Sequence, residues 1–205
     1  SSLCFRKRNK IRYMKTHPFK PVINKETKAL IVGTLPPETA PFYFSNSSKT
    51  RLWDVLRSIR DEKLIVYSGS YLLPVDQKTE ILNDLKLGIY DIIYGYDRKD
   101  QNSGKDVDVI PLAYADIPKA IKESKVEKLV FVYKSAAYWF LHSLTNEPPV
   151  KYSKLKYELN YGIFKELKLN NRIVECVLVP NPLSRGKAGE TMEYKLSIYK
   201  KYLSQ

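Results

Sequence analysis

Residues that could do chemistry gather directly after the apolar run Ala29–Val32. A buried strand that opens into a Gly/Pro loop before a helix places backbone N–H groups, hydroxyls and aromatic rings at the rim of a sheet. Proteins built from alternating strands and helices bind their ligands at such a rim. We therefore expect a ligand or active site in the stretch that follows the run, which contains Gly33-Thr34-Leu35-Pro36-Pro37, Phe42-Tyr43-Phe44, the polar loop 45–50 and Arg51-Leu52-Trp53.

The chain is strongly basic, and its charge indicates the kind of partner. It has 35 Lys and Arg against 22 Asp and Glu, which gives a formal net charge of +13. Such an excess favours a polyanion, because binding releases condensed counterions. Nucleic acid is the leading candidate, and a basic protein without a polyanionic partner is the alternative.

Positive charge is densest near the N-terminus. Residues 5–20 contain seven Lys or Arg and no acidic residue, and they are interleaved with Phe5, Tyr13 and Phe19. We interpret residues 1–27 as a basic arm. It either follows phosphates and offers rings for stacking, or it packs a few aromatic residues on the core.

Residues 28–205 are expected to form one domain, because 205 residues with 43% hydrophobic content can bury a full core. Short apolar runs alternate with helical stretches, which predicts an α/β fold with a mostly parallel sheet. The expected architecture is a three-layer α/β/α sandwich around four strands. The predicted strands cover 28–33, 88–93, 127–132 and 172–179, and the predicted helices cover 50–60, 76–85, 116–124, 135–144 and 191–202.

A hairpin is expected next to the last of these strands. Residues 163–167 and 173–177 alternate between apolar and polar side chains, and Asn170-Asn171 lies between them. Asn tolerates positive φ, which a tight hairpin turn requires. The hairpin should add an antiparallel edge to the sheet.

Cysteine and histidine are too few for several kinds of site. Cys4 and Cys176 lie far apart, which makes a disulfide framework or a zinc site a poor interpretation. His17 and His142 are the only histidines, and neither is placed for a Ser-His-Asp triad. We expect no metal and no cofactor, and a cytoplasmic monomer that is nucleoid-associated if bacterial. No apolar run approaches the roughly 20 residues of a membrane span, and no signal-peptide pattern is present.

The order of these motifs resembles the uracil-DNA glycosylase superfamily, and most closely its mismatch-uracil and hypoxanthine branches. The resemblance covers most of residues 28–203. It rests on Gly33-Thr34-Leu35-Pro36-Pro37, the aromatic run, Arg51-Leu52-Trp53, Leu87-Gly88-Ile89-Tyr90-Asp91-Ile92-Ile93 and Val179-Pro180-Asn181-Pro182-Leu183-Ser184-Arg185. It implies an enzyme that flips a base out of DNA, single- or double-stranded, and hydrolyses its N-glycosidic bond.

The resemblance also implies residue roles. Asp91 would bind the base edge or hold a pocket loop. Residues 94–98 after it are predicted to form a loop, which Ser103 and Asp106 would brace. Leu183 would be the wedge that enters the base stack. The base pocket would comprise Gly33, Thr34, Leu35, Pro36, Phe42, Tyr43, Phe44 and Asp91, and the DNA contacts would be Lys49, Arg51, Asn181, Leu183, Ser184, Arg185 and Lys187.

The first motif departs from the family pattern at its catalytic position. The uracil enzymes hold an Asp or Asn there to orient water, whereas this chain has Leu35. The hypoxanthine branch uses an Asn whose position corresponds to Thr50, although Thr50 could instead cap the helix that follows. Asn46 is the nearest amide, so Asn46 is the first catalytic candidate, with Ser48 or Thr50 assisting. Pocket electrostatics alone could also suffice.

Two other functions fit the same residues. One is a catalytically weak or inactive DNA-binding protein, and the other is a nucleotide or small-molecule hydrolase on a similar scaffold. A Rossmann dinucleotide role is disfavoured, because no Gly-x-Gly-x-x-Gly follows a predicted strand.

Overall fold

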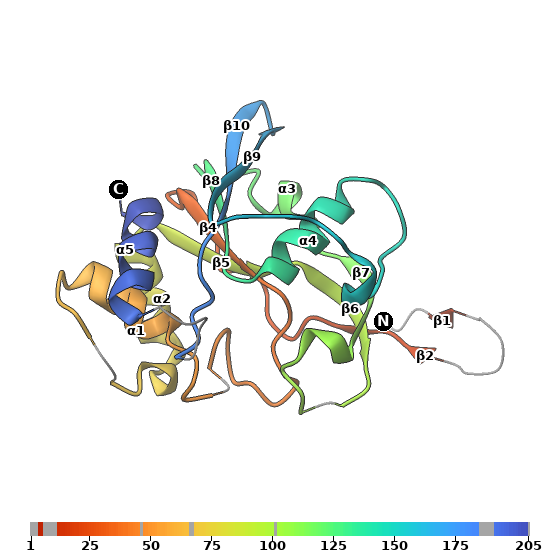
Figure 1. Cartoon of the computed structure of the whole chain (residues 1–205), viewed down its shortest axis with the longest axis horizontal. Coiled ribbons are helices and arrows are strands. Elements are labelled where there is room, and N and C mark those ends of the chain that lie inside the picture. The colour runs from red at the N-terminus through yellow and green to blue at the C-terminus, as the bar shows by residue number, and fades with distance from the viewer. Residues whose placement is uncertain are drawn as a thin grey trace.

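A computed structural model describes residues 4–5, 12–45, 47–65, 68–100, 102–184 and 191–204, with side chains from residue 14 onward. Its main sheet has the strand order β5-β4-β8-β10-β9 (Figure 1). The carboxyl ends of the parallel strands meet at one edge of this sheet, which is where the predicted motifs lie. The strands are β4 (Ala29–Gly33), β5 (Leu87–Asp91), β8 (Lys128–Phe131), β9 (Gly162–Leu169) and β10 (Arg172–Leu178).

This main sheet has five strands, where the sequence predicted a core of four. β5, β4, β8 and β10 are parallel, as expected, and β9 adds an antiparallel fifth strand at the edge. The predicted hairpin is confirmed. Asn170 and Asn171 connect β9 to β10 with φ values of 50° and 64°. Positive φ at both central positions matches the twist of the two strands, which explains the Asn-Asn pair.

Helices cover both faces of the main sheet, which gives the predicted three layers. In Figure 1, one group of helices lies on one side of the sheet and a second group lies on the other. The predicted helix 116–124 is shorter than expected, although Asp116 does cap it by accepting the Lys119 N–H. The first group is α1 (Leu52–Arg60), α2 (Val75–Asp84) and α5 (Met192–Leu203), and the second is α3 (Ile117–Ala120) and α4 (Lys134–Ser143).

A second sheet was not predicted. Residues 94–98 were interpreted as a loop, but they belong to β6 (Ile93–Arg98), which pairs with β7 (Val109–Tyr114) and β3 (Lys15–Thr16). Gly95 permits close packing in this strand, since a Cβ at Gly95 would lie 2.8 Å from Met14 Sδ. Two further short strands, β1 (Cys4–Phe5) and β2 (Arg12–Tyr13), pair with each other.

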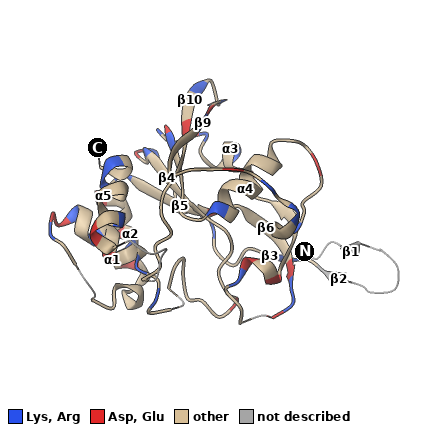
Figure 2. Cartoon of the chain, in the orientation of Figure 1, with Lys and Arg blue, Asp and Glu red and all other residues tan. Residues whose placement is uncertain are grey.

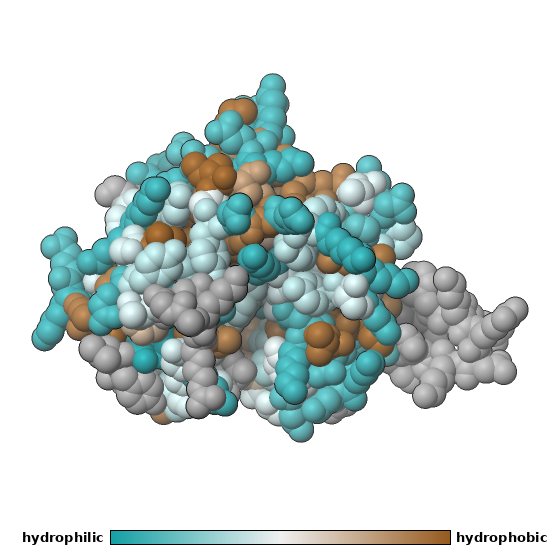
Figure 3. Space-filling view, viewed as in Figure 1, coloured by the Kyte–Doolittle hydropathy of each residue, from teal (hydrophilic) through white to brown (hydrophobic). Residues whose placement is uncertain are grey.

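The core lies on both faces of the parallel strands. Every residue of β4 and β5 is buried, as is typical of parallel strands covered by helices on both sides. Burial raises the pKa of the Cys176 thiol to about 12, so this cysteine is an unreactive core residue. The face drawn in Figure 3 is mostly hydrophilic. None of the helices in the described ranges has the length and apolar character to cross a membrane.

Lys78 of α2 is a buried cation in this core. Its Nζ donates to Ser45 Oγ at 2.5 Å and to the Tyr71 carbonyl at 2.7 Å, and it lies 5.5 Å from the centre of the Trp53 ring. Desolvation lowers the pKa of Lys78 to about 8. Lys78 therefore ties α2 to Ser45, at the start of the polar loop, and its charge is costly there.

Lys78 should make stability depend on pH. The unfolded lysine keeps its proton up to about 10.5, whereas the folded one loses it above about 8. At Lys78 the unfolded state therefore binds more protons across this window, so the contribution of this residue to the free energy of unfolding should rise with pH. Buried Cys176, with its raised pKa, contributes in the opposite direction in all variants. Lys78→Met should remove this rise, and Lys63→Met, which changes an exposed lysine, should keep it. Denaturant titrations from pH 7.5 to 10.5 measure the difference. Equal slopes for wild type and Lys78→Met would contradict the assignment.

Candidate active site

A cavity of about 570 Å³ opens at the carboxyl ends of β4 and β5. Its volume falls within the roughly 300–1,000 Å³ of small-ligand sites. The first-motif loop, the polar loop before α1, the turn after residue 103 and the loop before α5 all contribute to it. It is lined by Thr34, Leu35, Pro36, Pro37, Phe44, Ser47, Lys49, Thr50, Asp91, Gly104, Lys105, Asp106, Tyr133, Leu183 and Ser184.

Asp91 reaches the cavity at the end of β5, beside Gly33 of β4. The two residues are register partners in the parallel ladder. A Cβ at Gly33 would lie 2.3 Å from Asp91 Oδ1 and 3.0 Å from Phe44 Cζ. Glycine is therefore required at position 33, because any side chain there would displace the Asp91 carboxylate.

The second oxygen of Asp91 is held by His17. His17 Nε2 lies 3.0 Å from Asp91 Oδ2, and both side chains are buried. The His17 ring also stacks on Tyr43, with ring centres 5.5 Å apart. No sequence pattern indicated a role for His17 in this site, because 74 residues separate it from Asp91.

Asp106 is a second carboxyl group in the cavity wall. It lies in the short 3-10 helix η2 (Asp106–Asp108) and accepts a hydrogen bond from Ser135 at the start of α4. Part of the residue reaches solvent, but burial of the carboxyl group raises its pKa above the ordinary value. The charge of Asp91 adds to this rise, while hydrogen bonds from Ser135 and Thr34 oppose it. Asp106 therefore belongs to the cavity, whereas the sequence suggested only a loop brace.

Ser103 has the bracing role that was expected. Its Oγ donates to Asp108 Oδ2 at 2.6 Å and accepts from the Lys105 N–H. This fixes the turn that presents Lys105 and Asp106 to the cavity. Asp108 itself does not line the cavity.

One aromatic wall of the cavity is a stacked pair. The rings of Phe44 and Tyr133 lie 6.1 Å apart at 19°. Phe44 has a φ of 52°, a strained conformation for a bulky residue. Phe42 and Tyr43 do not line the cavity, which corrects their assignment to the base pocket. They pack in the core, where Tyr43 is completely buried.

Polar side chains of the second sheet fix the first-motif loop from behind. Arg98 of β6 donates from Nη1 to the Pro36 carbonyl at 2.9 Å and from Nη2 to the Leu35 carbonyl at 3.3 Å. Lys15 of β3 bonds both carboxylate oxygens of Glu38 at 2.8 Å. The second sheet thus supports the loop that lines the cavity.

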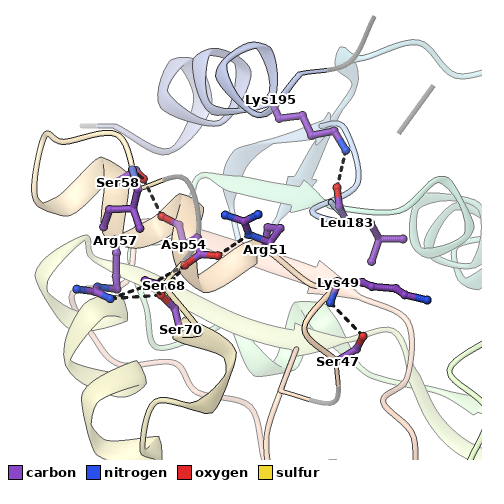
Figure 4. Close-up of polar contacts among 11 residues, drawn as sticks. Ser47, Lys49, Arg51, Asp54, Arg57, Ser58, Ser68, Ser70, Leu183 and Lys195 are labelled. Carbon is purple, nitrogen blue, oxygen red and sulfur yellow. Dashed lines mark hydrogen bonds and ion pairs between the residues drawn. The ribbon is translucent and has the colours of Figure 1, made fainter. Parts of the chain in front are cut away.

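The rim is formed by two loops joined through their backbones. Thr50 and Leu183 form an antiparallel bridge, the Arg51 N–H donates to the Pro182 carbonyl, and the Ser184 N–H donates to the Lys49 carbonyl. In Figure 4 the side chains of Leu183 and Lys49 point to the same side, away from the Arg51–Asp54 contact. The pairing leaves both side chains at the cavity.

Helix α5 holds the second of these loops. Lys195 Nζ donates to the Leu183 carbonyl at 2.8 Å (Figure 4), and Tyr199 Oη donates to the Pro180 carbonyl at 2.9 Å. Asn181 was predicted to contact DNA. Instead, its Oδ1 accepts from the Leu183 N–H at 3.2 Å and from Lys195 at 3.4 Å, so this oxygen shapes the loop.

Arg51 was predicted to contact phosphate, and this is corrected. It is 7% exposed, and its Nε lies 2.5 Å from Asp54 Oδ2. Asp54 Oδ1 in turn accepts from Ser68 and Ser70 (Figure 4). Arg51 therefore anchors the rim loop to the start of α1.

The remaining predicted residues have varied positions. Thr50 lines the cavity but does not cap α1, which has no side-chain cap. Ser48 is exposed and is not part of the lining. Of the predicted site residues, Asn46, Arg185 and Lys187 lie outside the described ranges.

In Figure 2 Lys and Arg occur on the helical layers and on the β9–β10 hairpin, so positive charge extends well beyond the N-terminal arm.

Sequence patterns carried little information on the residues that were missed. Lys105, Tyr133 and Lys195 are each one member of a polar or aromatic group with many equivalents in this chain. Only Asp106 was singled out, through its spacing from Ser103. Within the described residues, no group of three or more His, Cys, Asp or Glu is arranged to hold a metal ion.

Comparison with known proteins identifies the fold. No family model matches the chain, and no curated protein matches it by sequence. Among solved structures, the chain is similar to a protein of Methanosarcina acetivorans, determined by solution NMR, that carries the provisional name uracil-DNA glycosylase. The TM-score is 0.57 at 13% identity, and the match covers 93% of this chain and 96% of the other. The chain therefore has a uracil-DNA glycosylase-like α/β fold.

The contact between Gly33 and Asp91 can be tested by a double-mutant cycle. Gly33→Ala should destabilise the protein by roughly 1–3 kcal/mol, the usual cost of overpacking. In an Asp91→Ala background the added methyl group no longer meets Oδ1, so Gly33→Ala should cost clearly less. Urea unfolding of the four proteins measures both costs. The same cost in both backgrounds would place the strain elsewhere.

Proposed function

We propose that the protein is a monofunctional DNA glycosylase that hydrolyses the N-glycosidic bond of a damaged or modified base flipped out of DNA. One observation carries this proposal. On a uracil-DNA glycosylase-like fold, a cavity of small-ligand size at the ends of β4 and β5 combines an aromatic wall with the carboxyl groups of Asp91 and Asp106. The net charge of +13 supports a polyanionic substrate.

We assign Asp106 as the general base that accepts a proton from the attacking water. Burial raises its pKa toward the range in which a carboxylate accepts protons effectively. The water oxygen bonds to C1′ of the sugar, and the C1′–N bond breaks with its electron pair leaving on the base. The water proton passes to Asp106. This assignment supplies the polar group that Leu35 lacks, and it adds Asp106 to the earlier candidates Asn46, Ser48 and Thr50.

We assign Asp91 and the aromatic wall to binding of the flipped nucleobase. An ionised Asp91 offers only acceptors, so it suits an N–H donor on the edge of the flipped base. The Phe44–Tyr133 pair provides an apolar wall of the kind that holds flipped bases. Uracil, hypoxanthine and xanthine all present an N–H on the edge that pairs in DNA, so this contact does not choose among them.

We assign the rim residues to contacts with the DNA strand around the flipped base. Leu183 is partly exposed on a loop that hydrogen bonds hold from two sides. A fixed apolar side chain at a pocket mouth can enter a base stack and support the flipped state. Lys49 and Ser184, which are exposed beside it, are assigned to phosphates.

Asp106→Asn should lower the rate of base excision by roughly 10²- to 10⁴-fold, the usual contribution of a general base. Affinity for DNA should stay unchanged. The measurement is alkali cleavage of oligonucleotides that carry uracil, hypoxanthine, xanthine or hydroxymethylated cytosine, in single and double strands. Because the ionised form accepts the proton, excision by the wild type should increase with pH through the raised pKa of Asp106.

Asp108→Asn is the matched control, because Asp108 shares the η2 turn but lies outside the cavity. It should keep wild-type activity. If the wild type excises a base and both variants lose the same amount of activity, the loss comes from a changed η2 turn and not from a missing general base. Salt-dependent DNA binding without excision of any base would favour the alternative, a catalytically inactive DNA-binding protein on this fold.

Leu183→Ala should separate excision from binding. Unstacking a base step costs a few kcal/mol, so losing the wedge should slow excision at least about tenfold, while affinity, which rests on phosphates, should fall much less. Single-turnover excision and fluorescence anisotropy measure the two effects. Leu72→Ala removes an exposed leucine away from the cavity and should change neither. Equal losses in rate and affinity for Leu183→Ala would argue against a wedge.

A further inference from the structure

The N-terminal segment 15–20 contacts the first-motif loop, the end of β5 and the aromatic run, which together surround the cavity. Lys15 bonds Glu38 of the first-motif loop, and His17 bonds Asp91 at the end of β5. The Tyr43 hydroxyl donates to the Lys20 carbonyl at 3.1 Å. This segment falls within the predicted basic arm, yet its described residues are integrated into the site.

His17 is the member of this segment that reaches a reactive group. Its side chain is 0% exposed, enclosed by Tyr43, Phe19 and Tyr90. An ionised carboxylate can only accept, so the proton in the contact with Asp91 lies on His17 Nε2. That hydrogen bond holds Oδ2. Oδ1, which lies beside Gly33, is the other acceptor of this cavity-lining residue.

The other ring nitrogen has a partner in both charge states of His17. Nδ1 lies 3.1 Å from the Phe19 N–H, which can donate to a neutral ring. It also lies 2.8 Å from the Phe19 carbonyl, which can accept from a protonated ring. The Nε2–Asp91 hydrogen bond is therefore kept whether or not Nδ1 carries a proton.

We propose that His17 is a positioning residue for the reaction: it fixes the Asp91 carboxylate so that Oδ1 meets the substrate base in one orientation. The proposal rests on the proposed glycosylase function. It also means that part of the N-terminal segment belongs to the catalytic domain. His17 acts through Asp91 and does not itself touch the substrate.

Two variants separate positioning from packing. His17→Gln can place an amide N–H near the position of Nε2, whereas His17→Met fills similar space without a donor. His17→Met should lower kcat by roughly 10- to 100-fold, the effect typical of residues that orient a functional ligand, with little change in KM. His17→Gln should restore most of this loss. Comparable losses in both variants, full activity in both, or a change confined to KM would overturn the proposal.

An NMR measurement keeps this test independent of the enzyme assay. In the wild type, the ¹⁵N spectrum should show a proton on His17 Nε2, and Asp91→Asn should shift that signal. His142, which is bonded to the Pro148 carbonyl in another part of the structure, is the internal control and should not change. If the wild type excises no base, the proposed function fails. His17 is then judged by NMR alone, and an unprotonated Nε2 or an unchanged signal overturns the positioning role.

Discussion

The buried carboxylate of Asp91 is the constraint on which the rest of the site depends. A carboxylate that is 4% exposed is costly unless it is paired and hydrogen-bonded. Three features meet this requirement together. β5 is in register with β4, so Asp91 lies beside position 33. Glycine at that position leaves room for Oδ1, and His17 comes from the N-terminal segment to bind Oδ2.

The rim follows a different principle, in which buried charges hold loops so that other side chains can face the cavity. Arg51 pairs with Asp54, and Lys195 bonds the Leu183 carbonyl. Arg51 was predicted to contact DNA, but both cations are buried. Their role is to fix the backbone that presents Lys49 and Leu183. A rigid rim suits the flipped base that we propose for this pocket, because less ordering is needed on binding.

The cavity contains two carboxyl groups in different surroundings. Asp91 is matched to a histidine, whereas Asp106 is bonded by hydroxyl groups and has a raised pKa. Environments that differ in this way allow chemically identical groups to take different roles in a reaction. The fold is shared with a provisionally named uracil-DNA glycosylase, but a fold can carry many activities. The proposed chemistry therefore depends on these two side chains and not on the likeness alone.

The sequence by itself determined the local elements. Apolar runs predicted the four parallel strands, Asn170-Asn171 predicted the hairpin turn, and the first motif predicted the loop after β4, which lines the cavity. The tertiary structure alone decided which side chains meet there: His17 with Asp91, Asp106 with Ser135, and Thr50 with Leu183. It also turned Tyr43 and Arg51 inward, and made residues 94–98 a strand. The physical reason is the separation along the chain of the residues that interact. Periodicity and turn chemistry depend on neighbouring residues, whereas these contacts join residues tens of positions apart and form only when the packed core brings them together.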